Sequence, residues 1–391
     1  MAHYKILVPP PRRHRTGRIV LVVAAIVIVV GAGAFLVGRH IQDDSHRARS
    51  HGGAKTATPP SKPLTVVSTT PATGATSVAS NQVVSVHLSL PVTGATGMPA
   101  FTPPVSGTWA KTGPDTLSFH ASAPFIPTST ETLLIPAGAQ GPASTDGKVL
   151  GAPVSITFTV AQASTERLQQ LLAELNYLPL SFTATGSPSS GANAMTSQAG
   201  TFAWRWANPP SSLMALWSEG FENIITKGAV MDFENQNGLT VDGLAGPKVW
   251  STLLADVAAM KVDADPYNYV SVSKVLPESL TLYENGAPVL VNIPVNTGAP
   301  GADTVDGTFP VFEHVTSSRM QGTNPDGSTY DDPNVPWASY FNGGDALHGF
   351  VRATYGSPQS NGCVEMRIAD AAKVWPLSPI GTLVTVAGPA S

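Results

Sequence analysis

Residues 346–366 read Ala-Leu-His-Gly-Phe-Val-Arg-Ala-Thr-Tyr-Gly-Ser-Pro-Gln-Ser-Asn-Gly-Cys-Val-Glu-Met and contain Cys363, the only cysteine of the 391-residue chain. Cys363 follows a Ser-Asn-Gly sequence and lies fifteen residues after His348. A thiol is a useful nucleophile only as its thiolate, which a nearby imidazole and converging backbone N–H groups stabilise. A buried, inert cysteine is the alternative. The setting of Cys363 favours a nucleophilic active site.

This stretch closely resembles the signature of the L,D-transpeptidases (YkuD-type domains), in which a His-Gly pair and a Ser-x-Gly-Cys-apolar element flank a loop of this length. The segment Thr304-Val-Asp-Gly-Thr-Phe309 resembles the upstream Thr-Pro-x-Gly-x-Phe element of that family. The resemblance extends over roughly residues 265–388. It implies a mainly-β catalytic domain at residues 265–391, built as a curved β-sheet sandwich with the active site at one end.

The residue pattern predicts the strands of this domain independently. Asn285-Gly286 is a strong hairpin signal between two of them. The predicted strands are 268–274, 279–283, 288–293, 307–315, 336–341 and 383–386, and a short helix is predicted at 368–374.

The resemblance implies a role for each residue near the thiol. Cys363 attacks the carbonyl between a diamino acid and D-Ala of a donor stem peptide, D-Ala leaves, and a side-chain amine of an acceptor stem takes the acyl group to give a 3→3 cross-link. His348 takes the thiol proton and later protonates the leaving amine. The carbonyl of Gly349 orients the His348 ring.

Further residues are predicted to shape the site and bind substrate. The N–H groups of Cys363 and Gly362 point at the developing oxyanion. Ser360 and Asn361 shape the turn. The candidates for substrate contact are Tyr330, Tyr340 and Arg352. Tyr330 lies where the family has a lid tyrosine. The alternative for Tyr340 is a packed strand residue, and the alternative for Arg352 is a solvated loop residue.

Three positions depart from the family pattern. Asn361 stands where many members have His, and Val305 replaces the usual proline. Glu365 stands where Arg or Asn is common. A carboxylate near the thiol disfavours the thiolate unless it points away or is itself paired. His314 lacks an adjoining Gly or nucleophile and is predicted to be a structural or a surface residue. No metal is implied, because one Cys and scattered His give no zinc-type spacing.

The N-terminus predicts a membrane anchor. Residues 1–18 are basic and contain no acid, whereas residues 19–38 are apolar and uncharged. Twenty residues at about 1.5 Å each span a bilayer of about 30 Å. The basic flank predicts a cytoplasmic tail at 1–18 and an exported remainder, which begins with a polar linker at 39–62. A cleaved signal peptide ending near Gly31-Ala-Gly-Ala34 is the alternative.

Two further modules are predicted between the linker and the catalytic domain, so the chain is multidomain. Residues 63–161 contain short β-rich runs punctuated by Pro and Gly, as in 154–160, where apolar and polar residues alternate. They predict a β-sandwich and resemble bacterial Ig-like domains, with Val105-Ser-Gly-Thr-Trp109 and residues 143–150 as the recognisable parts. Its expected role is a spacer.

Residues 162–260 predict a small α-helical module. Leu168, Leu171, Leu172 and Leu175 form one helix face after Ser164, and two more helices end at Gly238 and begin at Pro247. Residues 229–254 resemble the peptidoglycan-binding domain. An insertion at 181–226 is predicted to be a mobile loop up to about Gly200 and then a packed element with tryptophans, for which a sugar-stacking platform is the alternative.

Together these features predict a membrane-anchored peptidoglycan L,D-transpeptidase acting in the cell-wall space. Its expected partners are stem peptides, glycan and the membrane, with carbapenem β-lactams as covalent inhibitors and no cofactor. A net charge of −4 gives no sign of nucleic-acid binding. An L,D-carboxypeptidase, an enzyme that joins proteins to the wall, and an inactive peptidoglycan-binding scaffold with Glu365 as the lesion are the alternatives.

Overall fold

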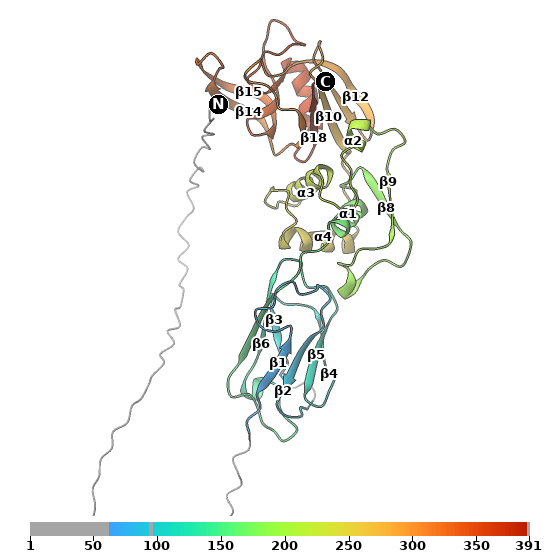
Figure 1. Ribbon diagram of the computed structural model, residues 1–391, viewed down its shortest axis with the longest axis vertical. Coiled ribbons are helices and arrows are strands. Elements are labelled where there is room, and N and C mark those ends of the chain that lie inside the picture. Colours follow the sequence, from blue (N-terminus) through green and yellow to red (C-terminus); the bar gives the residue numbers. More distant parts are fainter. Residues whose placement is uncertain (1–61, 94–96, 389–391) are drawn as a thin grey trace, which may run out of the picture. The chain divides into compact units, whose positions relative to one another are not determined.

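A sandwich of two antiparallel sheets forms the first region of the computed structural model, which describes residues 62–93 and 97–388 (Figure 1). Phe125 and Phe158 meet edge to face in its core, with ring centroids 5.5 Å apart. One sheet has the order β1 (Val66–Thr70), β2 (Val84–Leu88), β5 (Thr116–Ala121), β4 (Gly107–Lys111), and the other β3 (Ala100–Thr102), β6 (Thr130–Ile135), β7 (Val154–Thr159). A 3-10 turn, η1, spans Gly138–Gln140.

The sandwich confirms the predicted strand at 154–160. In β7, Ile156 and Phe158 are buried while Ser155 and Thr157 are exposed. Strand β4 was not predicted, because most of its residues are exposed and carry no apolar alternation. The predicted tail, membrane anchor and nearly all of the linker lie outside the described residues. Within 62–93 and 97–388, no helix is long and apolar enough to cross a bilayer.

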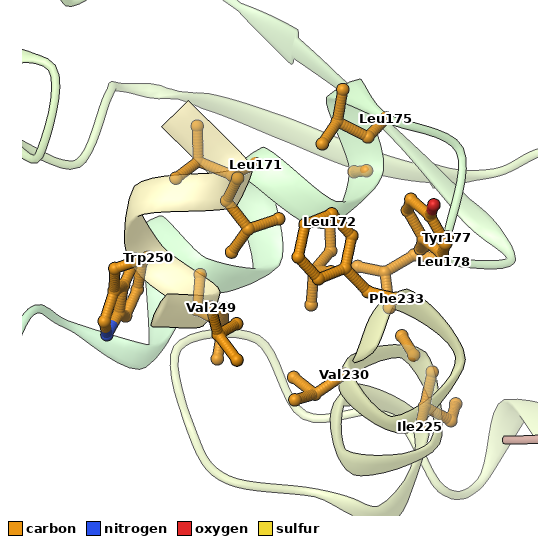
Figure 2. Close-up of a cluster of buried hydrophobic side chains, with 14 of the residues drawn as sticks. Leu171, Leu172, Leu175, Tyr177, Leu178, Ile225, Val230, Phe233, Val249 and Trp250 are labelled. Carbon is orange, nitrogen blue, oxygen red and sulfur yellow. The ribbon is translucent and has the colours of Figure 1, made fainter. Parts of the chain in front are cut away.

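Three helices of the second region enclose a common apolar core: α1 (Thr165–Glu174), α3 (Ile224–Gln236) and α4 (Pro247–Ala259). The Ser164 hydroxyl accepts the N–H of Arg167 at 3.1 Å, which confirms the predicted N-cap. Figure 2 shows Leu172 and Phe233 among side chains that converge from these helices, and both are fully buried. The helices therefore lie where the leucine and glycine-proline patterns predict them.

The insertion folds differently from its prediction. Residues 181–200 are not a simple loop, because β8 (Leu180–Ala184) and β9 (Gly200–Trp204) form a hairpin whose Phe182 and Phe202 rings lie 5.0 Å apart. The 3-10 turn η2 (Gly191–Asn193) lies between these strands, and the short helix α2 (Ser211–Met214) follows them. Trp204 and Trp217 are partly buried and pack against the helical core, as the packing interpretation of the tryptophans predicts.

The third region is organised on one nine-stranded sheet in the order β13-β18-β10-β11-β12-β17-β16-β15-β14. Only β10–β18 and β16–β17 pair in parallel. Helix α5 (Ile368–Val374), found where it was predicted, packs against β16, and η3 (Trp375–Leu377) follows it. The strands are β10 (Asn268–Ser273), β11 (Ser279–Glu284), β12 (Ala287–Asn296), β13 (Gly307–Pro310), β14 (Glu313–Thr323), β15 (Thr329–Asn342), β16 (Asp345–Gly349), β17 (Val364–Met366) and β18 (Leu383–Ala387).

Two features of this sheet differ from the prediction. The expected strand 307–315 is broken into β13 and β14, and β14 with β15 forms a long hairpin that the sequence showed only in part. The His-Gly pair belongs to β16, and the residues after Cys363 form β17. The second and third regions share buried side chains: Tyr269 and Leu383 belong to the same apolar cluster as the three helices.

Replacing Phe233 with Ala removes a ring that is completely buried and packs edge to face on Tyr177. We expect Phe233→Ala to cost the helical region about 3–5 kcal/mol. Phe221→Ala is the matched control, because 71% of the Phe221 side chain is exposed, and it should change stability by less than about 0.5 kcal/mol. Native-state hydrogen exchange of the α1, α3 and α4 amides measures both. Equal protection in the two variants would contradict this core.

Candidate active site

Parallel pairing of β16 with β17 brings the His-Gly and Cys elements together. His348 is the register partner of Glu365, and Leu347 that of Val364. Because side chains alternate along a strand, His348, Glu365 and the preceding Cys363 belong to one face of this pair. His348 and Cys363 both line a cavity of about 270 Å³. Cys363 is partly exposed, whereas His348 is only 2% exposed.

The imidazole of His348 is held in one tautomer. Its Nδ1 lies 3.1 Å from the carbonyl oxygen of Gly349. A carbonyl only accepts hydrogen bonds, so Nδ1 carries the proton and Nε2 of the neutral ring is a free base. Burial lowers the pKa of His348, against the smaller opposing effects of the Gly349 carbonyl and of Glu365. The predicted contact between Gly349 and the ring is therefore present, and the ring is neutral at pH 7.

The thiol of Cys363 is neutral as well. Burial raises its pKa to about 12; the Ala346 N–H acts in the opposite direction, and the carboxylates of Asp345 and Glu365 add to the rise. Sγ lies 3.6 Å from the carbonyl oxygen of Gly344, to which a thiol donates. A neutral thiol and a neutral imidazole therefore share the cavity in this state.

The turn before the cysteine is held by Ser360. Its buried hydroxyl donates to the carbonyl oxygen of Cys363 at 2.6 Å and accepts the N–H of Gly362 at 3.2 Å. The prediction that the Gly362 N–H points at an oxyanion is therefore corrected, because this donor is used inside the turn. Gly362 has φ +110°, and a Cβ there would meet the Asp345 carboxylate at 2.5 Å. Asn361 donates to the side chain of Asn324 at 2.6 Å.

The carboxylate of Glu365 is paired with Arg352. Arg352 donates to both of its carboxylate oxygens, from Nε at 2.7 Å and from Nη2 at 2.8 Å. Such a bidentate pair offsets the cost of burying a carboxylate that is 4% exposed. Arg352 lines the cavity, as a substrate contact requires, but much of its hydrogen-bonding capacity serves Glu365.

The two candidate tyrosines are placed differently. Tyr330 on β15 lines the cavity with Cys363. Tyr340 is not among the lining residues: its hydroxyl lies 2.7 Å from that of Ser318, and its ring faces Phe312, so it packs within the sheet. His314 stacks on Trp375 with centroids 4.0 Å apart, which confirms its structural role.

Several residues that line the cavity were not predicted from the sequence. The β14–β15 hairpin contributes Met320, Asn324, Asp332 and Val335, and Phe350 follows β16. The available signal was the alternation that places Asp332 on the same strand face as Tyr330. Over residues 62–93 and 97–388, no cluster of His, Cys, Asp and Glu could hold a metal ion.

A second cavity lies in the helical region, where residues 243–246 approach Trp250. Its volume is about 610 Å³, and Asn223, Lys227 and Leu244 are among its lining residues. The Trp250 indole is 2% exposed, and its N–H has no acceptor in the part of the chain that the structure describes. In Figure 2 the indole nitrogen points away from the other labelled side chains. This cavity therefore contains a buried donor without a partner.

Comparison with protein families assigns two of the three regions. Residues 267–386 match YkuD, the L,D-transpeptidase catalytic domain. The chain carries an L,D-transpeptidase catalytic domain. Residues 60–160 match Big_5, a bacterial Ig-like domain, so the β-sandwich is an Ig-like domain. The helical region lies between these two matched ranges.

Similar solved structures include L,D-transpeptidases from two mycobacteria. L,D-transpeptidase 3 from Mycobacterium tuberculosis is 14% identical over 82% of this chain and 98% of its own, with a TM-score of 0.29. An L,D-transpeptidase from Mycobacterium smegmatis is 13% identical over 83% and 100%, with a TM-score of 0.28. The catalytic domain of the E. faecium L,D-transpeptidase is 23% identical over 32% and 100%, with a TM-score of 0.28. No curated protein matches the chain.

We expect Asp345 to make the reactivity of the Cys363 thiol depend on pH. Burial raises the pKa of Asp345 to about 6, against hydrogen bonds from Asn342 and the Val305 N–H. Above pH 6 its charge raises the thiol pKa, so Asp345→Asn should make Cys363 about three- to tenfold more reactive there. Below about pH 5 the carboxyl is protonated, so the variant and the wild type should react alike.

Labelling by a methanethiosulfonate reagent from pH 5 to pH 9 measures this difference. Asp306→Asn is the control, because the Asp306 side chain is 58% exposed and pairs with Lys274. Equal labelling of wild type and Asp345→Asn at every pH would rule out the effect of Asp345 on the thiol.

Proposed function

We propose that this protein is a peptidoglycan L,D-transpeptidase in which Cys363 forms the acyl-enzyme and His348 is the general base. The observation that carries the proposal is the shared cavity, which is lined by a partly exposed thiol and by an imidazole whose Nε2 is unprotonated. The matched catalytic domain supplies the reaction class. A nucleophile and a base in one partly enclosed site are the minimum that acyl transfer requires.

The neutral resting pair favours proton transfer during the attack. As Sγ of Cys363 bonds to the donor carbonyl carbon, its proton moves to Nε2 of His348. The backbone N–H of Cys363 is the remaining predicted donor to the oxyanion. The tetrahedral intermediate then collapses: the bond to the D-Ala nitrogen breaks, His348 returns the proton to that nitrogen, and a thioester on Cys363 remains.

The second half of the proposed reaction decides its product. Attack on the thioester by a stem-peptide amine gives the 3→3 cross-link. Attack by water gives L,D-carboxypeptidase activity, and attack by an amine of a protein attaches that protein to the wall. Carbapenem β-lactams should acylate the same sulfur.

The proposed place of the enzyme is the outer face of the cell membrane. Residues 19–38 supply the anchor, and the basic tail at 1–18 stays inside. The linker and the Ig-like domain then separate the catalytic domain from the bilayer, as a spacer does. This arrangement gives Cys363 access to the peptidoglycan.

Product analysis tests this function. The protein is incubated with tetrapeptide-stem muropeptides, and D-Ala release and dimers are followed by mass spectrometry. Cys363→Ala should abolish both, and His348→Gln should slow D-Ala release by about 10²–10⁴-fold, since it removes the general base. His120→Gln, at an exposed position of the Ig-like domain, should match the wild type. Wild type that neither turns over nor is acylated at Cys363 by a carbapenem would favour the inactive scaffold.

We also propose that the helical region binds peptidoglycan glycan in the cavity beside Trp250. The residues that carry its resemblance to the peptidoglycan-binding domain include Gly243, Gly246 and Trp250, and these line the cavity. The unpartnered Trp250 N–H is a donor for which a sugar hydroxyl is a suitable acceptor.

Trp250→Phe keeps most of the ring packing and removes the N–H. We expect it to weaken sedimentation of the Cys363→Ala protein with insoluble peptidoglycan by about three- to tenfold. Trp206→Phe, outside this cavity, is the control. Unchanged sedimentation of Trp250→Phe would show that the cavity does not hold the glycan.

A further inference from the structure

One carboxylate in the active-site cavity, that of Asp332, forms no ion pair with any of the described residues. The charged side chains that line this cavity are those of Glu365, Arg352 and Asp332. Glu365 and Arg352 neutralise each other. Asp332 has neither a hydrogen-bond donor nor an ion-pair partner on its side chain among the described residues. A carboxylate in a partly enclosed cavity is best stabilised by a cation.

Comparison with the neighbouring Asp331 shows that the lack of a partner is particular to the position of Asp332. Adjacent residues of β15 face opposite sides of the strand. Asp331 is exposed and receives the guanidinium of Arg319, with Nε at 2.7 Å from Oδ1. Asp332 shares the opposite face with Tyr330, and both line the cavity. The two neighbouring aspartates thus have different environments. Asp331 is paired with an arginine of the protein, whereas Asp332 faces the active-site cavity.

The electrostatic influence of Asp332 reaches the residues of the reaction. Burial lowers the pKa of His348, and the Asp332 charge acts in the opposite direction. The same charge adds to the rise in the pKa of Arg352, caused mainly by Glu365, and in that of Tyr330, caused mainly by burial. Such influence requires that the carboxylate lie near the imidazole. Asp332 and Cys363 line the same cavity, so a cation bound by Asp332 shares that cavity with an acyl group on Cys363.

We propose that Asp332 is a specificity-determining residue that binds the primary ammonium group of the acceptor beside the thioester on Cys363. This inference rests on the proposed function, because it assigns the acceptor subsite of the same reaction. The ligand class is a peptide that carries a free aliphatic amine. A charge-assisted hydrogen bond from the ammonium to the carboxylate supplies both binding energy and orientation.

The transfer step balances without any further reactant. The bound ammonium gives one proton to Nε2 of His348 and becomes a neutral amine. Its nitrogen then attacks the thioester carbon, so that a C–N bond forms and the C–S bond breaks. The second proton leaves the nitrogen for sulfur and restores the Cys363 thiol. His348 releases the first proton to water, and Asp332 takes no part in the proton transfers.

The test separates acylation from amine transfer in the full-length protein. Acylation is measured as D-Ala release from a donor tetrapeptide, and the partition of the acyl-enzyme between dimer and hydrolysed product is measured against acceptor concentration. Asp332→Asn should raise the acceptor concentration at which half of the acyl-enzyme becomes dimer. The factor of this increase should be about ten times the factor by which the variant slows acylation. Asp332→Glu, which keeps the charge, should retain most of the amine transfer. Asp331→Asn is the matched control and should partition like the wild type.

An acceptor analogue with a hydroxyl in place of the amine provides the second comparison. It has no positive charge, so wild type and Asp332→Asn should use it equally. Equal partition of the amine acceptor by both proteins, or a loss of acylation as large as the loss of transfer, would overturn the assignment. Wild type without any acylation would overturn the proposed function itself, and with it this subsite. Thermal unfolding of Asp332→Asn confirms that the variant is folded.

Discussion

The parallel pairing of β16 with β17 is the constraint on which the site depends. It is only three residues long, yet Leu347 and Val364 within it are essentially buried in the core of the sheet. A register shift of one residue would turn these side chains out of the core and put His348 or Glu365 into it, so the register is strongly specified. The alignment of His348 with Cys363 is thus a consequence of core packing and needs no contact between the two side chains.

The same packing determines the charge state of the site. Burial penalises the imidazolium and the thiolate, so a charged pair is not the resting form. The carboxylate of Asp345 reinforces this for the thiol. A neutral thiol is less readily oxidised than a thiolate, which suits a lone cysteine that the proposed location exposes to an oxidising medium. The bidentate Arg352–Glu365 pair allows a carboxylate to be buried on the His348 face without leaving a bare charge there.

Sequence reasoning predicted the parts of the molecule that have a local signal. The hairpin of β11 and β12, the helix after Cys363 and the N-cap of α1 each depend on neighbouring residues, and each was found. The partner of Glu365 was not identified, because thirteen residues and a crossover separate it from Arg352. Asp332 was missed for a related reason: Pro325, Pro333 and Pro336 obscured the long hairpin, since proline argues against a strand interior. In the insertion, cross-strand packing of two phenylalanines overrode a loop-like composition.

The hydrogen bond between Asn361 and Asn324 connects the β14–β15 hairpin to the nucleophile turn. Asn361 lies between Ser360, which holds the Cys363 carbonyl, and Gly362, whose N–H is bound to the same hydroxyl. A substrate that displaces the hairpin must therefore break this hydrogen bond or move the turn with it. Tyr330 and Asp332 lie on the same hairpin, so this hydrogen bond joins the element that carries both cavity residues to the nucleophile turn. A substrate that enters the cavity beside Cys363 lies next to both the hairpin and the nucleophile turn. Its entry is therefore linked to the geometry of the nucleophile.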